Sequence, residues 1–267
     1  MRNMSKTIVI SGASSGIGFA TAEYLDSLGY NVIGLSRKYP TSDYKFKYFL
    51  CDITKETQIE KFVDFLNIET ESIDVLVNCA GMGVSGAIEY STEEELRKIF
   101  DVNVFGQFLL TKNLIPLLRK SSDAKIINIG SVAGELIIPF QTFYSMTKAA
   151  MHAFSEGLRN ELKPFNIQVT SVLPGDIKTD FTKNREMPKV LEDDLYKDRI
   201  KKSLARMAKD EEMGMPAISV SKVILKLIRM KRLPVAKTVG FQYKLFVFLK
   251  RIFPKSFVNW IIKKMYG

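Results

Sequence analysis

The sequence predicts a doubly wound α/β fold, in which helices cover both faces of a mostly parallel sheet. Over the first 175 residues, short runs rich in β-branched residues alternate with longer stretches of helical period. Most of these runs are continuously apolar, as strands buried on both faces are. Strands that alternate with helices require βαβ crossovers, and therefore a parallel sheet. Because no linker, repeat or low-complexity tract divides the 267 residues, we expect a single domain.

Six strands and four helices are expected in this first part of the chain. The predicted strands are residues 7–10, 31–35, 47–50, 75–78, 125–129 and 168–173. The predicted helices are 16–28, 55–66, 92–119 (in one or two pieces) and 143–163. Gly29 closes the first helix and Pro164 ends the last, as these residue types commonly do.

After Pro174 the pattern changes, and we expect a lid over a ligand at about residues 176–216. This segment is polar, mixed in charge and dotted with methionines, with a helical middle around 191–209. A long insertion after the last regular strand lies where a ligand binds in such folds. A helix at 218–230 and a short edge strand at 235–239 complete the domain, which we take to be residues 1–240.

A glycine-rich loop directly follows the first predicted strand and precedes an apolar helix. It reads Ser-Gly-Ala-Ser-Ser-Gly-Ile-Gly over residues 11–18. Glycines permit a tight turn and close approach of the backbone, and a helix N-terminus presents free N–H groups to a pyrophosphate. The spacing is G-x-x-x-G-x-G, so the strand and helix around the loop carry much of the prediction. We predict phosphate contacts from Gly12, Ser14, Ser15, Gly16, Ile17 and Gly18.

Two cations follow the second strand, at Arg37 and Lys38, and the next acidic residue is Asp43. An acid at this point of a dinucleotide-binding fold holds the ribose 2′-hydroxyl, whereas an arginine accommodates a 2′-phosphate. The pair therefore favours NADP(H), with NAD(H) left open.

Polar residues at later strand ends and on the helices beside them suggest acid–base chemistry. Tyr144 and Lys148 are four residues apart, so they share one face of a helix. A nearby ammonium lowers the pKa of a phenol, as general acid–base catalysis requires near neutral pH. Ser131 follows the fifth strand, where its hydroxyl can hold a substrate oxygen. A pair Tyr-x-x-x-Lys alone is not specific; its order after the glycine loop makes it informative.

Taken together, these motifs resemble the short-chain dehydrogenase/reductase family over residues 7 to about 179. The combination is the glycine loop, Asn-x-Ala-Gly at 78–81, a helical Asn103, then Ser131, Tyr144 and Lys148. Ser11 stands where the family usually has threonine, and Cys79 where a second asparagine is common. The resemblance implies a Rossmann fold, an NAD(P)-dependent oxidoreductase and assembly into a homodimer or homotetramer.

The resemblance also implies a role for each matching residue. Tyr144 would give or take the proton, Ser131 would orient the substrate carbonyl, and Lys148 would bind the nicotinamide ribose. Asn103 would hold a water of a proton relay. Further cofactor contacts would come from Asp52, Ile53, Asn78, Ala80, Gly81, Pro174, Gly175, Ile177 and Thr179.

The charge of the chain is concentrated in its C-terminal fifth. The composition is that of an ordinary globular protein (46% hydrophobic, 25% charged), and the net charge is +10. From residue 213 onward there are nine lysines, three arginines and no acidic residue, so this segment carries +12 and the rest −2. The excess therefore belongs to one segment and says little about the reaction.

We expect residues 241–267 to form a basic amphipathic helical extension. Apolar residues recur at helical spacing at 245, 248, 249 and 252, and again at 258, 261, 262 and 265. Such helices either lie on a membrane surface or pack on the body, over the cleft or against a partner subunit. Nucleic acid is not expected as a partner of this extension, because apolar residues dominate it.

The tail also looks like that of hydroxysteroid and retinol dehydrogenase-like members of the family, which implies a lipophilic carbonyl or alcohol substrate.

Two alternatives for function and the cellular location follow from the same features. One alternative is a reductase of 3-oxoacyl groups on an acidic carrier protein, docked by the basic tail; the other is a non-catalytic NADPH-binding scaffold.

Two cysteines provide neither a disulfide framework nor a metal site. No apolar run is long enough to span a membrane or form a signal peptide. We therefore expect the protein in the cytoplasm, with peripheral membrane association left open.

Overall fold

The computed structural model describes residues 5–181, 185–186 and 195–266. Its centre is a seven-stranded parallel sheet in the order β3-β2-β1-β4-β5-β6-β9. The strands are β1 (Thr7–Ser11), β2 (Asn31–Ser36), β3 (Lys47–Leu50), β4 (Val75–Asn78), β5 (Lys125–Ile129), β6 (Gln168–Pro174) and β9 (Ala236–Val239). All six strands predicted in the first part are confirmed, and so is the short edge strand.

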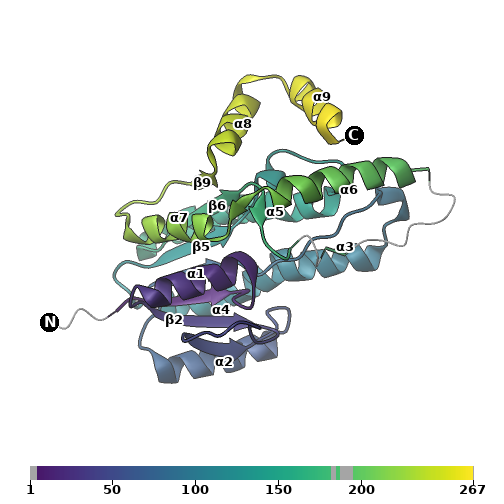
Figure 1. Cartoon of the computed structure of the whole chain (residues 1–267). Coiled ribbons are helices and arrows are strands. Elements are labelled where there is room, and N and C mark those ends of the chain that lie inside the picture. The colour runs from purple at the N-terminus through teal and green to yellow at the C-terminus, as the bar shows by residue number, and fades with distance from the viewer. Residues whose placement is uncertain (1–4, 182–184, 187–194, 267) are drawn as a thin grey trace.

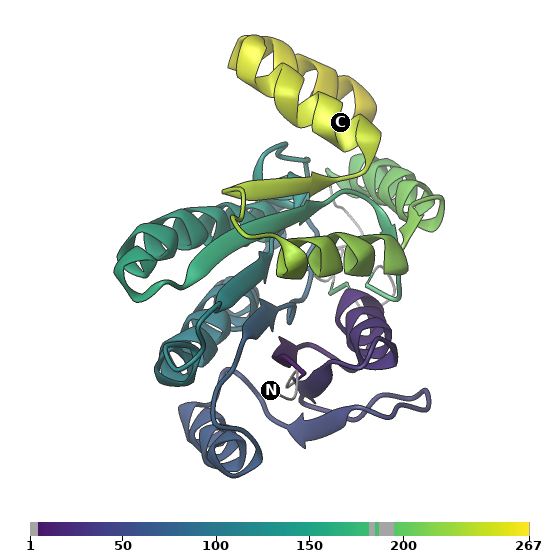
Figure 2. The same cartoon turned by 90° about the vertical axis from the view of Figure 1, so that its left-hand side faces the viewer.

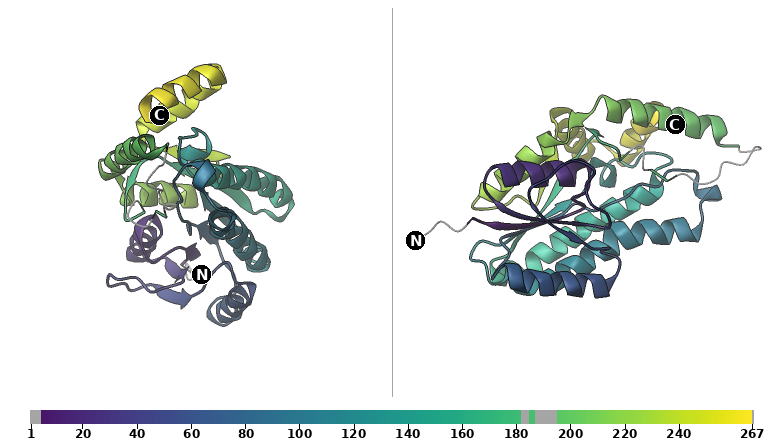
Figure 3. Two further views of the ribbon diagram at one scale, coloured as in Figure 1. Left: turned by 90° about the vertical axis from the view of Figure 1, so that its right-hand side faces the viewer. Right: turned by 60° about the horizontal axis from the view of Figure 1, so that its bottom comes forward.

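Helices cover both faces of this sheet, as Figures 2 and 3 show in nearly end-on views. One face carries α1 (Gly16–Ser27) and α7 (Ile218–Arg229); the other carries α2 (Glu56–Glu69), α4 (Gly106–Leu118) and α5 (Thr142–Glu161). Neighbouring residues of a strand point to opposite faces, so Ile8 and Ile10 pack on the first layer and Val9 on the second. The predicted doubly wound fold is confirmed.

The long helical stretch at 92–119 consists of three consecutive pieces. Helix α3 (Glu93–Phe100) begins with a capping box between Thr92 and Glu95. A π-helical turn, η2 (Asp101–Phe105), then leads into α4. Isolated π turns occur often at functional sites, and this one contains the buried Asn103.

The segment after β6 forms structure that the sequence only partly predicts. A short parallel pair, β7 (Ile177–Lys178) and β8 (Met215–Pro216), is new. Between the two strands lies α6 (Lys197–Glu212), which corresponds to the predicted helical middle at 191–209. Residues 191–194 of that prediction, and 182–184 and 187–194 of the predicted lid, lie outside the described residues.

The C-terminal extension forms two helices, α8 (Phe241–Ile252) and α9 (Lys255–Tyr266), separated at Pro254. Figure 1 shows α8 rising from the end of β9 and α9 turning back above α6. Lys250 donates to Glu135 at 2.6 Å, and the Tyr266 hydroxyl donates to Asp210 of α6 at 3.1 Å. The extension therefore packs on the body near the cleft. None of the helices in the described part of the chain is long and apolar enough to cross a bilayer.

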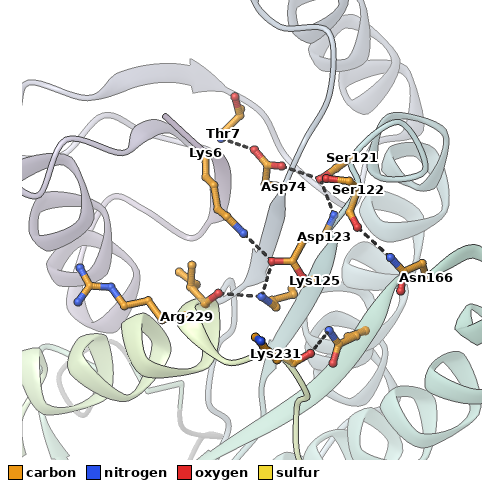
Figure 4. A network of polar contacts seen from close by, with 12 residues as sticks. Lys6, Thr7, Asp74, Ser121, Ser122, Asp123, Lys125, Asn166, Arg229 and Lys231 are labelled. Carbon is orange, nitrogen blue, oxygen red and sulfur yellow. Dashed lines mark hydrogen bonds and ion pairs between the residues drawn. The ribbon is translucent and has the colours of Figure 1, made fainter. Parts of the chain in front are cut away.

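A polar network lies at the N-terminal ends of the parallel strands (Figure 4). Lys125 is 1% exposed, and its ammonium donates to Asp123 at 2.9 Å and to the Ile228 carbonyl at 2.7 Å. Lys6 also donates to Asp123, at 2.7 Å. These bonds connect β5 and the start of β1 to the C-terminal end of α7. They leave the carboxyl ends of the strands, on the other side of the molecule, free for a binding site.

Candidate active site

A cavity of about 710 Å³ lies at the carboxyl ends of the strands. This is where ligands bind in open parallel sheets. Every residue that the sequence predicts for the site lines the cavity, except Asn78 and Asn103.

The glycine loop forms one end of the cavity, with its backbone packed too closely for side chains. A Cβ on Gly12 would lie 2.7 Å from the Cα of Ala80, and one on Gly18 would lie 2.3 Å from the Gly12 carbonyl oxygen. Gly12 and Gly16 also have positive φ values, of 70° and 55°. Ser15 at the start of α1 makes no capping bond with its side chain, so the first N–H groups remain available to a phosphate. The loop therefore fits a pyrophosphate.

Basic and polar groups surround the next part of the cavity, beyond the end of β2. Arg37 and Lys38 are exposed and line its rim. The Ser14 and Ser36 hydroxyls are hydrogen-bonded at 3.0 Å, which joins the glycine loop to this strand end. Asp52 and Ile53 line the neighbouring wall, and Asp52 accepts bonds from Thr54. The arrangement provides two cations beside a dinucleotide-sized groove.

The Asn-x-Ala-Gly segment divides between the cavity and the core. Ala80 and Gly81 line the cavity, and Ser11 accepts bonds from the backbone N–H groups of residues 79 and 80 at 3.1 and 3.2 Å. Asn78 is fully buried and donates to Thr111 and Asn128, both at 2.8 Å. Its side chain therefore joins neighbouring elements beneath the cavity, and does not line the ribose side as predicted.

Tyr144, Lys148 and Ser131 meet at the middle of the cavity. Tyr144 and Lys148 lie one turn apart on α5, with the Lys148 Nζ atom 5.5 Å from the centroid of the tyrosine ring. Lys148 donates to the Ile129 carbonyl at the end of β5, at 3.0 Å. Ser131 follows that strand and accepts a bond from the Ala133 N–H at 3.0 Å. Helix and strand end thus fix the three groups relative to one another.

Burial dominates the ionisation of these groups. It raises the pKa of the Tyr144 phenol to about 12, and a hydrogen bond from Ser131 opposes the shift. It lowers the pKa of the Lys148 ammonium to about 8. The predicted lowering of the tyrosine pKa by Lys148 is therefore not confirmed, because desolvation of the phenolate is the larger effect. The phenol is a proton donor across the neutral range.

Asn103 lies below the cavity wall in the π turn. Its side-chain amide accepts from the Met82 N–H at 2.8 Å and donates to the Met82 carbonyl at 2.9 Å and to Thr147 at 3.1 Å. The side chain thus connects η2, the segment after β4 and α5. This is a positioning role, and the water of a proton relay stays a prediction.

The loop after β6 closes the cavity beneath the C-terminal extension. Pro174, Gly175, Ile177 and Thr179 line the cavity, and their contacts with a cofactor stay a prediction. The aromatic ring of Tyr243 on α8 lies where a Cβ of Gly175 would be, 2.2 Å from it. The Tyr243 hydroxyl also donates to Asp176. Helix α8 therefore packs directly on the loop.

The far wall, opposite the glycine loop, contains residues that the sequence does not single out. Phe181 lies with its ring centroid 5.6 Å from that of Tyr144. Arg185 forms an ion pair with Glu211 of α6. The remaining wall residues at this end include Ile138, Met207 and Tyr266. They come from distant segments, and no motif or spacing connects them.

Comparison with known proteins identifies the family. The short chain dehydrogenase family matches residues 6–189. A 3-ketodihydrosphingosine reductase from Bacteroides thetaiotaomicron is 36% identical over 262 residues, which cover 97% of each chain. An NADPH-dependent 1-acyldihydroxyacetone phosphate reductase from Saccharomyces cerevisiae is 32% identical and covers 83% of this chain and 77% of the yeast protein. A short-chain dehydrogenase from Streptomyces avermitilis is 29% identical, with a TM-score of 0.79 over 93% of this chain and 94% of that one.

Fold and cavity define a dinucleotide-binding α/β oxidoreductase. The chain belongs to the short-chain dehydrogenase family, whose members bind NAD(P)(H) and act on carbonyl or alcohol groups.

Proposed function

We propose that the protein is an NADP(H)-dependent reductase of a long-chain lipid ketone of the 3-ketodihydrosphingosine type, with Tyr144 as the general acid. The observation that carries this proposal is the convergence of Tyr144, Ser131 and Lys148 in one cavity, whose far wall contains the apolar side chains of Phe181, Ile138 and Met207 beside an ion pair. The likeness to the Bacteroides reductase over nearly the whole of both chains supports the substrate class.

The residues divide the chemistry among them. A nicotinamide cofactor, held by the glycine loop and Lys148, would supply or accept the hydride when bound. Tyr144 donates its phenolic proton to the carbonyl oxygen during reduction, and takes a proton from the hydroxyl in the reverse direction. Ser131 holds that oxygen by a hydrogen bond where negative charge develops. Lys148 binds the nicotinamide ribose, and its positive charge stabilises the phenolate that remains after proton transfer.

Arg37 and Lys38 support NADP(H) as the cofactor in preference to NAD(H). Both line the cavity rim beyond β2, and neither is buried against an acidic side chain there. A guanidinium binds phosphate in a forked geometry that a ribose hydroxyl cannot exploit. The name of the yeast relative, an NADPH-dependent reductase, agrees with this choice.

The shape of the far wall supports a lipophilic substrate. Phe181, Ile138 and Met207 provide apolar surface next to Tyr144, and methionine adapts readily to a flexible chain. An acyl chain lying along this wall would place a nearby ketone at the tyrosine. The yeast relative supports a neighbouring alternative, an acylated dihydroxyacetone phosphate.

We further propose that the protein acts in the cytoplasm at a membrane surface. The apolar stripe of α8 faces away from the body: Leu245, Phe248 and Ile252 are 44%, 57% and 61% exposed. Tyr243 and Val247 make the contacts to the body instead. Lysines and arginines flank the stripe, and they attract anionic lipid headgroups. The tail packs on the body with one face, and its other face has no partner within the described chain, which supports the proposal that this face meets a membrane.

Two or four copies of the chain form the assembly that the family resemblance implies. Phe105 and Phe108 expose apolar surface around the start of α4, where a second copy can cover it. Light scattering coupled to size exclusion reports the number of copies directly.

Substitution of Tyr144 by phenylalanine tests the reaction. The variant keeps the ring and its contact with Phe181 but has no proton to give, so we expect turnover to fall by about 10²–10⁴-fold. NADPH binding, measured by fluorescence, should remain within about twofold. Full activity of Tyr144→Phe would refute the assignment.

The substrates of the parent protein separate the alternatives. If the parent does not reduce free lipid ketones but does reduce 3-oxoacyl groups on a carrier protein, the result would favour the carrier-protein alternative. No turnover of either would favour the scaffold.

A further inference from the structure

A buried ion pair lies in the far wall of the cavity, close to the proposed acid. The Arg185 side chain is 4% exposed and that of Glu211 is 16% exposed. Both line the cavity, and both charges act on the pKa of Tyr144, with Glu211 raising it and Arg185 lowering it. The ion pair therefore acts on Tyr144 from a wall that also contains apolar side chains.

Anchoring of the chain at residues 185–186 does not require this pair. The Ser85 N–H donates to the Glu186 carbonyl at 3.0 Å, and the Glu186 N–H donates to the Gly83 carbonyl at 2.9 Å. Lys98 adds an ion pair with the Glu186 side chain at 2.6 Å. A buried ion pair adds little stability of its own, because desolvation offsets much of the attraction. The pair is therefore better placed to act on a molecule in the cavity than to hold the chain in position.

Among the described residues that line the substrate end of the cavity, carboxylates outnumber cations by one, although the chain as a whole carries +10. Apart from the residues at the adenosine end, the described charged lining comprises the carboxylates of Asp176, Asp180, Glu186 and Glu211 and the cations of Lys98, Lys148 and Arg185. Asp210 is paired with Arg206 at 2.9 Å and is not among the lining residues, although it lies near enough to raise the pKa of Glu211, with burial as the larger cause. This excess of acid favours a cationic group on the substrate over a phosphate.

We propose that Glu211 binds the ammonium group of a 2-amino ketone and that Arg185 is a positioning residue that holds the Glu211 carboxylate toward the cavity. This proposal rests on the proposed function and specifies what the same site recognises. Glu211 lines the same cavity as Tyr144 and Ser131, and its charge acts on the Tyr144 phenol, so we place the ammonium of the substrate at Glu211 when the carbonyl oxygen lies at Tyr144 and Ser131. The alkyl chain then follows the apolar wall past Phe181 and Met207.

The test compares two ketones with one variant and one control. The probes are 3-ketodihydrosphingosine and a ketone of the same length that lacks the amine. Glu211→Gln keeps the size and hydrogen-bonding capacity of the side chain but removes its charge. Asp198→Asn makes the same change on the exposed side of α6.

We expect Glu211→Gln to lower kcat/KM for the amino ketone by at least about tenfold, through KM, because a charged hydrogen bond is lost. At pH 7 the Tyr144 phenol keeps its proton with or without the Glu211 charge, so turnover of the ketone without the amine should change by less than about threefold. Asp198→Asn should behave as the parent on both ketones. An equal loss on both probes would show that the pair is structural, and no loss would show that Glu211 does not meet the substrate. Either result overturns the proposal.

The parent protein alone gives a second test that does not depend on folding of a variant. A long-chain 2-amino alcohol should inhibit reduction at least tenfold more strongly than an alkyl phosphate of equal length. Stronger inhibition by the phosphate would overturn the proposal and assign Arg185 to a phosphate instead. Turnover of both ketones with equal kcat/KM would refute only the ammonium site, whereas turnover of neither would refute the proposed function itself.

Discussion

At the scale of single residues, Lys148 links burial to the pH dependence of the reaction. Burial lowers the pKa of its ammonium to about 8, below the ordinary value of 10.5. Tyr144 has a pKa of about 12 and so keeps its proton throughout this range. As the pH rises, Lys148 therefore loses its charge before Tyr144 loses its proton.

We expect kcat for ketone reduction to be constant below about pH 8 and to fall above it. Lys148→Arg retains a cation to higher pH, so its lower activity should show no such fall before about pH 10. Steady-state rates from pH 6 to pH 10.5 measure both profiles. A parent profile that stays flat to pH 10, or an unchanged fall in Lys148→Arg, would contradict the role of this charge.

Arg37 is the residue that we expect to determine the preference for NADPH over NADH. Arg37→Asp replaces a phosphate-binding cation with a carboxylate that repels a 2′-phosphate and accepts a bond from a ribose hydroxyl. We expect the ratio of kcat/KM for NADPH over NADH to fall by at least about tenfold. Equal use of both cofactors by the parent would count against NADP(H), as would an unchanged ratio in the variant.

At the scale of elements, the packing of α8 on the loop after β6 connects the C-terminal extension to the cavity. The ring of Tyr243 occupies the space that a side chain at position 175 would need. We expect Gly175→Ala to destabilise the protein by about 1–3 kcal/mol through overpacking. In a Tyr243→Ala background the same change should cost much less, because the two residues are in contact. Urea unfolding of the four proteins measures this coupling, and additive effects would exclude the contact.

Elements follow local patterns closely, which explains how far the sequence predicts them. Apolar runs and breakers such as Gly29 and Pro164 locate the strands and helices of the first part, and most differ from the structure by only a few residues. The pair β7–β8 escapes prediction because each strand has two residues and their partners are far apart in sequence. The π turn escapes prediction because residues 101–105 carry no residue type that distinguishes a π turn from the α-helix on either side.

At the scale of the whole molecule, the site combines a predictable half and an unpredictable half. Residues from Gly12 to Lys148 stand in motifs whose order identifies them. Arg185, Glu211 and Tyr266 line one cavity although they lie far apart in the sequence, and α9 lies beside α6 in the fold (Figure 1). The sequence reveals the charge of the tail, but not that its last helix lines the cavity.

The placement of the tail relates the cavity to a membrane surface. Tyr266 of α9 lines the cavity, while Phe248 of α8 and Trp260 of α9 are 57% and 52% exposed. The same two helices carry Lys244, Lys250, Arg251, Lys255, Lys263 and Lys264. A docked tail would therefore bring the far wall near the lipid from which a long-chain ketone comes.

The full chain should co-sediment with vesicles that contain phosphatidylglycerol, and less with phosphatidylcholine alone. High salt should release a large part of it, since each lysine or arginine near an anionic surface contributes about 1 kcal/mol. Phe248→Gln with Trp260→Gln should lower the bound fraction several-fold, because both rings are exposed and their loss leaves the fold intact. Ile68→Gln removes an apolar side chain from α2 that is even more exposed, at 85%; it is the matched control and should bind as the parent. If the double variant binds vesicles unchanged, or instead loses a dimer seen by light scattering, the apolar face belongs to a second copy of the chain.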